Sequence, residues 1–169
     1  MANYEFTVVS NEFKVKKSQF ENVKNALDCF DESYFNEETN TVKIASYDQD
    51  LSDDLVVLYD TRTKKVICSY DSGYWDKTDK IEENGYQIEV YLKQAGIESE
   101  EEYNEEDFEE LDFSEYMQSV LEDNEHILIK ETGNEKLRYN VACGILITKK
   151  SIQWLDLDRI AMDIVEKEK

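Results

Sequence analysis

The chain has 169 residues, of which 40 are Asp or Glu and 19 are Lys or Arg, and its net charge at pH 7 is −21. A charge of that size repels nucleic acid and anionic lipid and attracts basic surfaces, so we expect no direct binding to nucleic acid or to a membrane. The length suits one domain, spanning 1–169, and eleven Tyr, seven Phe and two Trp supply bulk for a core. No apolar run of about 18 residues, no signal peptide and no CxxC motif are present, which predicts a cytoplasmic protein.

The first half of the chain alternates between strand and helix patterns. Apolar residues alternate in short bursts over the first sixteen residues, which predicts two strands around a turn. Ser18-Gln19-Phe20-Glu21 is a capping-box pattern, and it predicts a helix over residues 19–30. Further strands are predicted over 42–46, 55–59 and 66–70, the last two as a hairpin.

The second half of the chain begins with an ambiguous stretch, 81–95, which fits both a strand and a helix. We favour a helix from about Gln87, because Gly96-Ile97 resembles a helix C-cap with its hydrophobic contact. Later patterns predict a helix over 114–123, strands over 127–129, 137–142 and 152–155, and a C-terminal helix from Asp156 with a buried apolar face. Residues 144–148 either continue the strand over 137–142 or pair again as a strand of their own. The expected fold is therefore α+β, with antiparallel β-hairpins or a meander and three or four packed helices.

Residues 98–125 form the most unusual segment, with fourteen Asp or Glu and no Lys or Arg. We expect an acidic, helical insertion made of short turns, because acids three or four residues apart repel one another along a helix. We also expect this insertion to supply little of the core. One interpretation is solvated filler; the other is a functional anionic surface, which the aromatic residues among the acids favour.

The functional interpretation has a physical basis. Duplex DNA carries one phosphate charge per roughly 1.7 Å of its axis, so carboxylates fixed at comparable density can occupy a cleft built for DNA. Tyr74 and Trp75, in an aromatic and acidic turn, fit either core packing or an anchor for a basic partner. The acids expected to contact the partner are Glu101, Glu102, Glu105, Glu106, Asp107, Glu109, Glu110 and Asp112.

Other candidate sites are weaker. The spacing of Asp48, Asp50, Ser52 and Asp54 is that of the first half of a calcium loop, but Asp53 stands where Gly is needed and Tyr59 where Glu is needed. A polar loop between strands is the favoured interpretation. His126, the single histidine, lacks any nucleophile motif around it. We therefore predict no catalytic residue, no metal and no cofactor.

In size, acidity, a composition biased towards AT-rich codons and lack of catalytic motifs, the chain resembles the small acidic inhibitors carried by phages and mobile elements, namely anti-CRISPR and DNA-mimic antirestriction proteins. The resemblance implies an inhibitor that binds the basic nucleic-acid-binding surface of a bacterial defence nuclease or its ribonucleoprotein complex. An immunity protein or antitoxin that neutralises a basic nuclease toxin is an alternative. A hydrolase with a carboxylate-bound metal is a third hypothesis.

Overall fold

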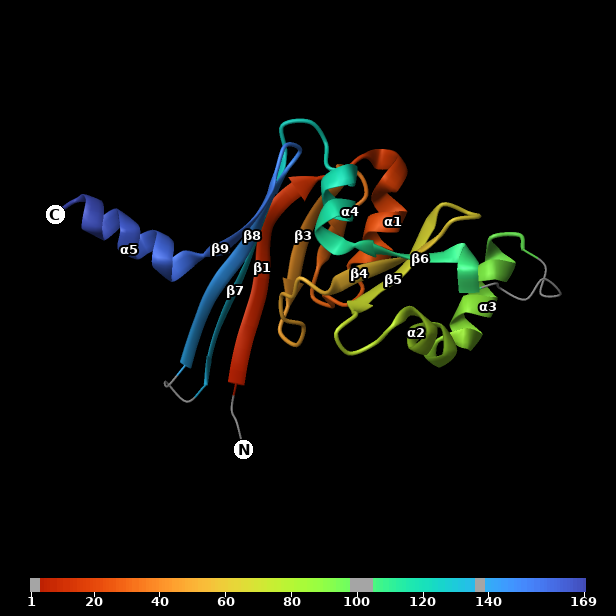
Figure 1. Cartoon of the computed structure of the whole chain (residues 1–169). Helices are drawn as coiled ribbons and strands as arrows, with labels where there is room; N and C mark the ends of the chain where they lie inside the picture. The colour runs from red at the N-terminus through yellow and green to blue at the C-terminus, as the bar shows by residue number, and fades with distance from the viewer. Residues whose placement is uncertain (1–3, 98–104, 136–138) are drawn as a thin grey trace.

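The protein folds into two antiparallel β-sheets with helices packed on them (Figure 1). A computed structural model describes residues 4–97, 105–135 and 139–169. The large sheet has the strand order β2-β3-β1-β7-β8-β9 and contains β1 (Tyr4–Lys14), β2 (Tyr34–Asn36), β3 (Thr41–Ser46), β7 (His126–Glu135), β8 (Tyr139–Thr148) and β9 (Ile152–Asp156). The small sheet has the order β5-β4-β6 and contains β4 (Leu55–Asp60), β5 (Lys65–Asp71) and β6 (Phe108–Asp112).

The helices are short and divide between the two sheets. They are α1 (Phe20–Ala26), α2 (Lys77–Glu83), α3 (Gly85–Gln94), α4 (Phe113–Val120) and α5 (Leu157–Lys167), with 3₁₀ turns η1 (Lys17–Gln19) and η2 (Glu105–Asp107). Figure 1 shows α1 and α4 beside both sheets, α2 and α3 near the small sheet only, and α5 projecting from the large sheet. Within the described residues, none of these helices has the length and apolar character needed to cross a lipid bilayer.

The main core joins the inner face of the large sheet to α1, α4 and one face of the small sheet. Every second residue of the central strands points inward, as in Ile127 and Ile129 of β7, and both side chains are fully buried. Phe30, which follows α1, packs against Phe113 of α4 with 5.5 Å between the ring centroids. Val57 of β4 reaches the same core from the small sheet.

A second, smaller core lies on the other face of the small sheet. Leu58 of β4 and Phe108 of β6 are buried there against Ile81 of α2 and Ile88 of α3. The middle strand β4 is therefore covered on both faces, which explains why its sequence, Leu-Val-Val-Leu-Tyr, is continuously apolar.

The α+β class and the hairpin of β4 and β5 are confirmed. The two strands expected around a turn in the first sixteen residues are wrong, because Tyr4–Lys14 form the single strand β1. The ambiguous stretch 81–95 is helical, with α2 before α3, and α3 ends at a left-handed glycine as expected. Gly96 has φ +82°, and the Ile97 N–H donates to the Leu92 carbonyl at 2.8 Å. The described chain contains five α-helices, which is one more than the upper number expected.

The expectation of a helical acidic segment is wrong for Phe108–Asp112, which form strand β6. This strand pairs antiparallel with β4, with Leu58 opposite Glu110 and Asp60 opposite Phe108. In a strand, neighbouring acids point to opposite faces of the sheet, so the pairing avoids the repulsion that a helix would impose. Residues 98–104, including Glu101 and Glu102, lie outside the described residues.

The expectation that the acidic segment supplies little of the core is also wrong. Its apolar residues are among the most buried of the described chain, since Phe108, Phe113, Met117 and Leu121 are at most 1% exposed. Phe108 and Phe113 lie in different cores, so the segment ties the two cores together. The C-terminal helix was expected to have a buried face, yet α5 has no buried residue.

Replacement of Phe108 by Ala tests the role of the acidic segment in the fold. We expect Phe108→Ala to lower the free energy of unfolding by about 3–5 kcal/mol, because the change leaves a cavity under β6. Urea unfolding followed by circular dichroism measures the loss. The milder truncation Phe108→Leu keeps a large apolar side chain and should lose less than the alanine variant does. An alanine variant as stable as the wild type would contradict the packing of β6.

Candidate partner-binding surface

Strand β6 presents carboxylates at the edge of the small sheet. It pairs with β4 on one side, and no other described strand pairs with it. Phe108 is buried and Leu111 half-buried, whereas Glu109 and Glu110 between them are exposed. Because successive side chains of a strand alternate, Glu109 and Glu110 lie on opposite faces of this edge. The two apolar residues hold the strand, and the two glutamates remain at the surface.

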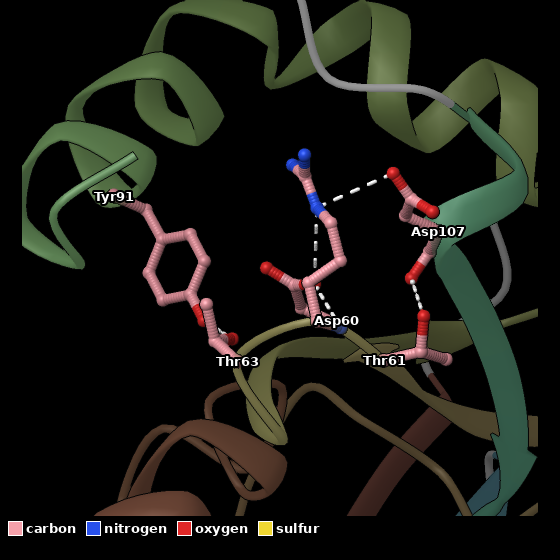
Figure 2. A network of polar contacts seen from close by, with 6 residues as sticks. Asp60, Thr61, Thr63, Tyr91 and Asp107 are labelled. Atoms are coloured by element: carbon pink, nitrogen blue, oxygen red, sulfur yellow. Dashed lines mark hydrogen bonds and ion pairs between the residues drawn. The ribbon is translucent and has the colours of Figure 1, made fainter. Parts of the chain in front are cut away.

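The residue before β6 is fixed to the turn between β4 and β5. The Asp107 carbonyl oxygen accepts hydrogen bonds from the Thr61 N–H and the Thr61 hydroxyl, both at 2.9 Å. The Asp107 carboxylate lies 3.2 Å from Nε of Arg62. Figure 2 shows Asp107 above the strand end that carries Asp60 and Thr61. Three contacts thus hold the start of β6 in place.

Asp60 is the fully buried member of this network. Its Oδ1 accepts a hydrogen bond from the Arg62 N–H at 2.9 Å and lies 4.0 Å from Arg62 Nε. Its Oδ2 is buried and has no hydrogen-bond partner among the described residues. A buried carboxylate is costly unless it is paired, so Asp60 depends on Arg62. The turn residues 60–63 thereby order the acidic strand that lies beside them.

The same turn contacts helix α3. The Thr63 and Tyr91 hydroxyls are 2.6 Å apart (Figure 2). Burial is the main cause that raises the pKa of Tyr91, which the hydrogen bond with Thr63 partly offsets. Tyr91 is therefore neutral at physiological pH, and it can donate or accept in this contact.

Helix α2 connects the acidic segment to the aromatic turn. The Thr78 hydroxyl of α2 donates to the Glu105 carboxylate. Trp75 lies just before Asp76, the N-cap of α2, and the Lys80 ammonium sits 5.0 Å from the centroid of the Trp75 ring. Helix α2 therefore links the two groups: the turn with Tyr74 and Trp75 leads directly into it, and Thr78 of the helix contacts Glu105 of the acidic segment.

The predicted partner-binding residues have different environments. Glu105, Glu106, Glu109 and Glu110 are exposed. Asp112 is exposed as well, but its carboxylate caps α4 by accepting the Glu115 N–H at 3.0 Å. Tyr74 is 82% exposed and Trp75 40% exposed.

Asp107 differs from the other predicted contacts, because it is half-buried and paired with Arg62. The absence of Lys and Arg from residues 98–125 predicts that these acids have no neutralising base, and this is incorrect for Asp107, because its base comes from a distant turn. The sequence analysis missed Asp60, Thr61 and Arg62 as supporting residues. A sequence signal existed, because Arg is scarce in this chain and one of the few stands in the predicted turn.

A second acidic region surrounds the loop before β4. A surface hollow of about 650 Å³ is lined by four carboxylates and by Tyr74 and Trp154; the acids are Asp50, Asp53, Asp54 and Asp71. Among the described residues, no three His, Cys, Asp or Glu side chains are placed to hold a metal ion. The geometry thus offers no support for the calcium-loop interpretation of residues 48–54.

The three thiols are weak nucleophiles. Burial raises the pKa of Cys29 and of Cys68 to about 12 in each case. Burial and the neighbouring Glu131 carboxylate raise the pKa of Cys143 to about 11. Since the thiolate is the reactive form, all three cysteines are protonated and unreactive at neutral pH.

Comparison with protein-family models, with curated proteins and with solved structures finds no match for this chain. The functional argument therefore rests on the charges, burial and contacts described above.

The pairing of Arg62 with the buried Asp60 predicts a coupled effect on stability. Arg62→Met should lower the free energy of unfolding by about 1–3 kcal/mol, because it leaves the Asp60 carboxylate unpaired. Asp60→Asn removes that charge, so the double variant should lose less than the sum of the single losses, by about 0.5–2 kcal/mol. Urea unfolding of the four proteins measures this coupling. Lys65→Met is the matched control and should change stability by less than about 0.5 kcal/mol. If the losses of Arg62→Met and Asp60→Asn simply add in the double variant, the pairing is contradicted.

The raised thiol pKa values predict slow alkylation. At pH 8 the folded protein should react with iodoacetamide about two hundredfold more slowly than free cysteine, mainly through Cys143, because little thiolate is present. The rate should keep rising up to about pH 11, whereas the rate of the urea-unfolded chain should level off above about pH 9. Mass spectrometry of intact protein measures both rates. A folded-state rate that levels off below pH 9 would show that these thiols have ordinary pKa values.

Proposed function

We propose that this protein is an acidic inhibitor that acts in the cytoplasm of a bacterial host. It binds the basic nucleic-acid-binding surface of a defence nuclease or its ribonucleoprotein complex and blocks access to nucleic acid. The observation that carries the proposal is the edge strand β6, which presents Glu109 and Glu110 at the surface while its apolar residues anchor it. The net charge of −21 adds to the negative electrostatic potential that these carboxylates create.

Preorganisation supports the proposal. Successive residues of a strand rise by about 3.4 Å and alternate between its faces, so Glu109 and Glu110 present carboxylates on both faces of the edge strand, just after the exposed Glu105 and Glu106 of η2. Asp107 is held by Thr61 and Arg62, which fixes the start of β6 before any partner arrives. A fixed array loses less conformational entropy on binding than a mobile tail does.

The aromatic turn suits a partner rich in arginine. Tyr74 lies beside the hollow lined by Asp50, Asp54 and Asp71. Carboxylates accept paired hydrogen bonds from a guanidinium group, and an aromatic face attracts the same cation. Trp75 already has the Lys80 ammonium over its ring, which indicates that this turn tolerates a cation nearby.

The function is tested with bacterial strains that carry defined CRISPR or restriction systems. Expression of the protein should restore plaque formation by a phage that one such system excludes. With the purified nuclease, the protein should inhibit both DNA binding and DNA cleavage, and excess target DNA should relieve the inhibition. If the protein binds the nuclease but leaves DNA binding intact, occupation of the nucleic-acid surface is the wrong mechanism.

Charge reversal on β6 is the most direct prediction from this proposal. Glu109→Lys/Glu110→Lys should weaken binding to the nuclease by about tenfold to a thousandfold, because two favourable charges become repulsive in a basic cleft. The fold should survive, since both side chains are exposed. Surface-binding kinetics measure the loss, and the wild-type association rate should fall as salt rises.

The matched control changes the same total charge elsewhere. Glu37 and Glu38 are exposed in the turn between β2 and β3, in the other sheet. Glu37→Lys/Glu38→Lys should therefore cost less than about threefold in affinity, through the long-range field only. Equal losses for the two double variants would mean that net charge, rather than the β6 surface, determines binding.

A further inference from the structure

Helix α5 has an apolar stripe with no partner in the described chain. At 100° per residue, Leu157, Ile160, Ala161, Ile164 and Val165 fall on one side of the helix. Ile160 is 42% exposed, Ile164 55% and Val165 47%. The helix contacts only β8 and β9 to any extent, near its first turn, and Figure 1 shows it projecting away from the sheet. A stripe of this kind forms a stable helix when it packs on another apolar surface.

The large sheet has an apolar patch on its outer face that matches the apolar stripe of α5. Val9, Leu128, Leu146 and Leu155 point away from the main core, because their neighbours Val8, Ile127, Ile129, Ile145 and Ile147 are fully buried on the inner face. Leu128 lies directly opposite Leu146, and Leu155 lies opposite Gly144 on the next strand. All four side chains are half-buried, and no described helix covers them.

The helix cannot reach this face of its own sheet. Strand β9 ends at Asp156 and α5 begins at Leu157, so no loop residue separates them. The Asp156 carboxylate accepts the Arg159 N–H at 3.1 Å and so caps the helix at its point of departure. Reversal of a helix onto the preceding sheet usually takes a connection of about 2–6 residues. The stripe and the outer face are therefore available to a second chain.

We propose that two copies of this chain form a two-fold dimer in which each α5 docks on the outer sheet face of the other copy. Charge complementarity favours this occupant. Lys130 lies on the outer face opposite Val9, whereas Asp158 borders the apolar stripe of α5, and none of the described ion pairs involves either residue. Lys43 lies on the same face with Glu12 opposite it. The chain as a whole is strongly acidic, so Lys130 on this face is suited to a carboxylate of the docked helix.

The surface area that this dimer would bury is also sufficient for a stable interface. A helix of eleven residues is about 16 Å long, and two helices exchanged across a two-fold axis bury on the order of 1,300 Å² when both sides are counted. Stable interfaces bury roughly 1,200–2,000 Å². One helix alone would fall short of that range, so the reciprocal exchange is the arrangement that the area favours. The interface leaves β6 free, since β6 belongs to the other sheet.

Sedimentation equilibrium of the full-length chain tests the proposal. One chain has a mass of 19.9 kDa, and the wild type should sediment with twice that mass. Ile160→Glu/Ile164→Glu should weaken the dimer by about a hundredfold or more and keep the fold, because α5 has no buried residue. Leu128→Thr/Leu146→Thr, on the sheet face, should weaken it similarly, since threonine suits an exposed strand position. Circular dichroism confirms that each variant is folded.

Met162→Glu is the matched control. Met162 is 57% exposed and lies outside the stripe, about 60° beyond Val165 around the helix, so this variant should dimerise like the wild type. A monomeric wild type would overturn the proposal. So would a dimer that survives the α5 substitutions, or one that is lost in the α5 variant but kept in the sheet-face variant. Binding of the wild-type monomer to phosphatidylglycerol vesicles through Ile160 and Ile164 would overturn it in favour of a lipid surface.

Discussion

The pairing of β6 with β4 is the contact on which the rest of this structure depends. β4 is the middle strand of the small sheet and contributes side chains to both cores, with Val57 on one face and Leu58 on the other. β6 pairs with the edge of β4 opposite to β5 and places Phe108 in the second core. Three acids of the segment, Glu109, Glu110 and Asp112, therefore lie on a strand of the small sheet rather than on a separate appendage.

Charge and packing act against each other in this region. Ten or more acids close together repel one another and oppose the compact state, whereas burial of aromatic side chains favours it. The chain resolves the conflict by alternation, since Phe108 and Leu111 point into the two cores and Glu109 and Glu110 remain in water. Arg62 neutralises the one acid, Asp107, that must lie close to the buried Asp60.

The sequence predicts local elements well where their signal is local. Strands β3, β4 and β5 show alternation or dense apolar runs, and the end of α3 shows its glycine. β6 has only two apolar residues in a run of acids, and its partner β4 is about fifty residues away, so its pairing leaves no local signal. The contact of Arg62 with Asp107 is invisible for the same reason, because proximity created by folding cannot be deduced from spacing along the chain.

Helix α5 illustrates a different limit. Its periodicity correctly predicts a helix and an apolar stripe, but periodicity says only that the stripe needs a partner, and not that the partner belongs to the same chain. The α5 residues are exposed, although the pattern alone predicts a buried face. Helix α5 follows β9 without a loop residue and projects away from its own sheet, so the stripe stays exposed in the single chain.

The separation of buried apolar residues from exposed glutamates along β6 has an evolutionary consequence. Phe108 and Leu111 pack into the cores, whereas Glu109 and Glu110 are exposed at the surface. Substitutions at the two glutamate positions can therefore accumulate without loss of the fold, while the supporting positions stay constrained. A protein whose target changes under selection could follow that target by altering two surface residues, and close variants of this chain should differ there before they differ in the strand's apolar residues.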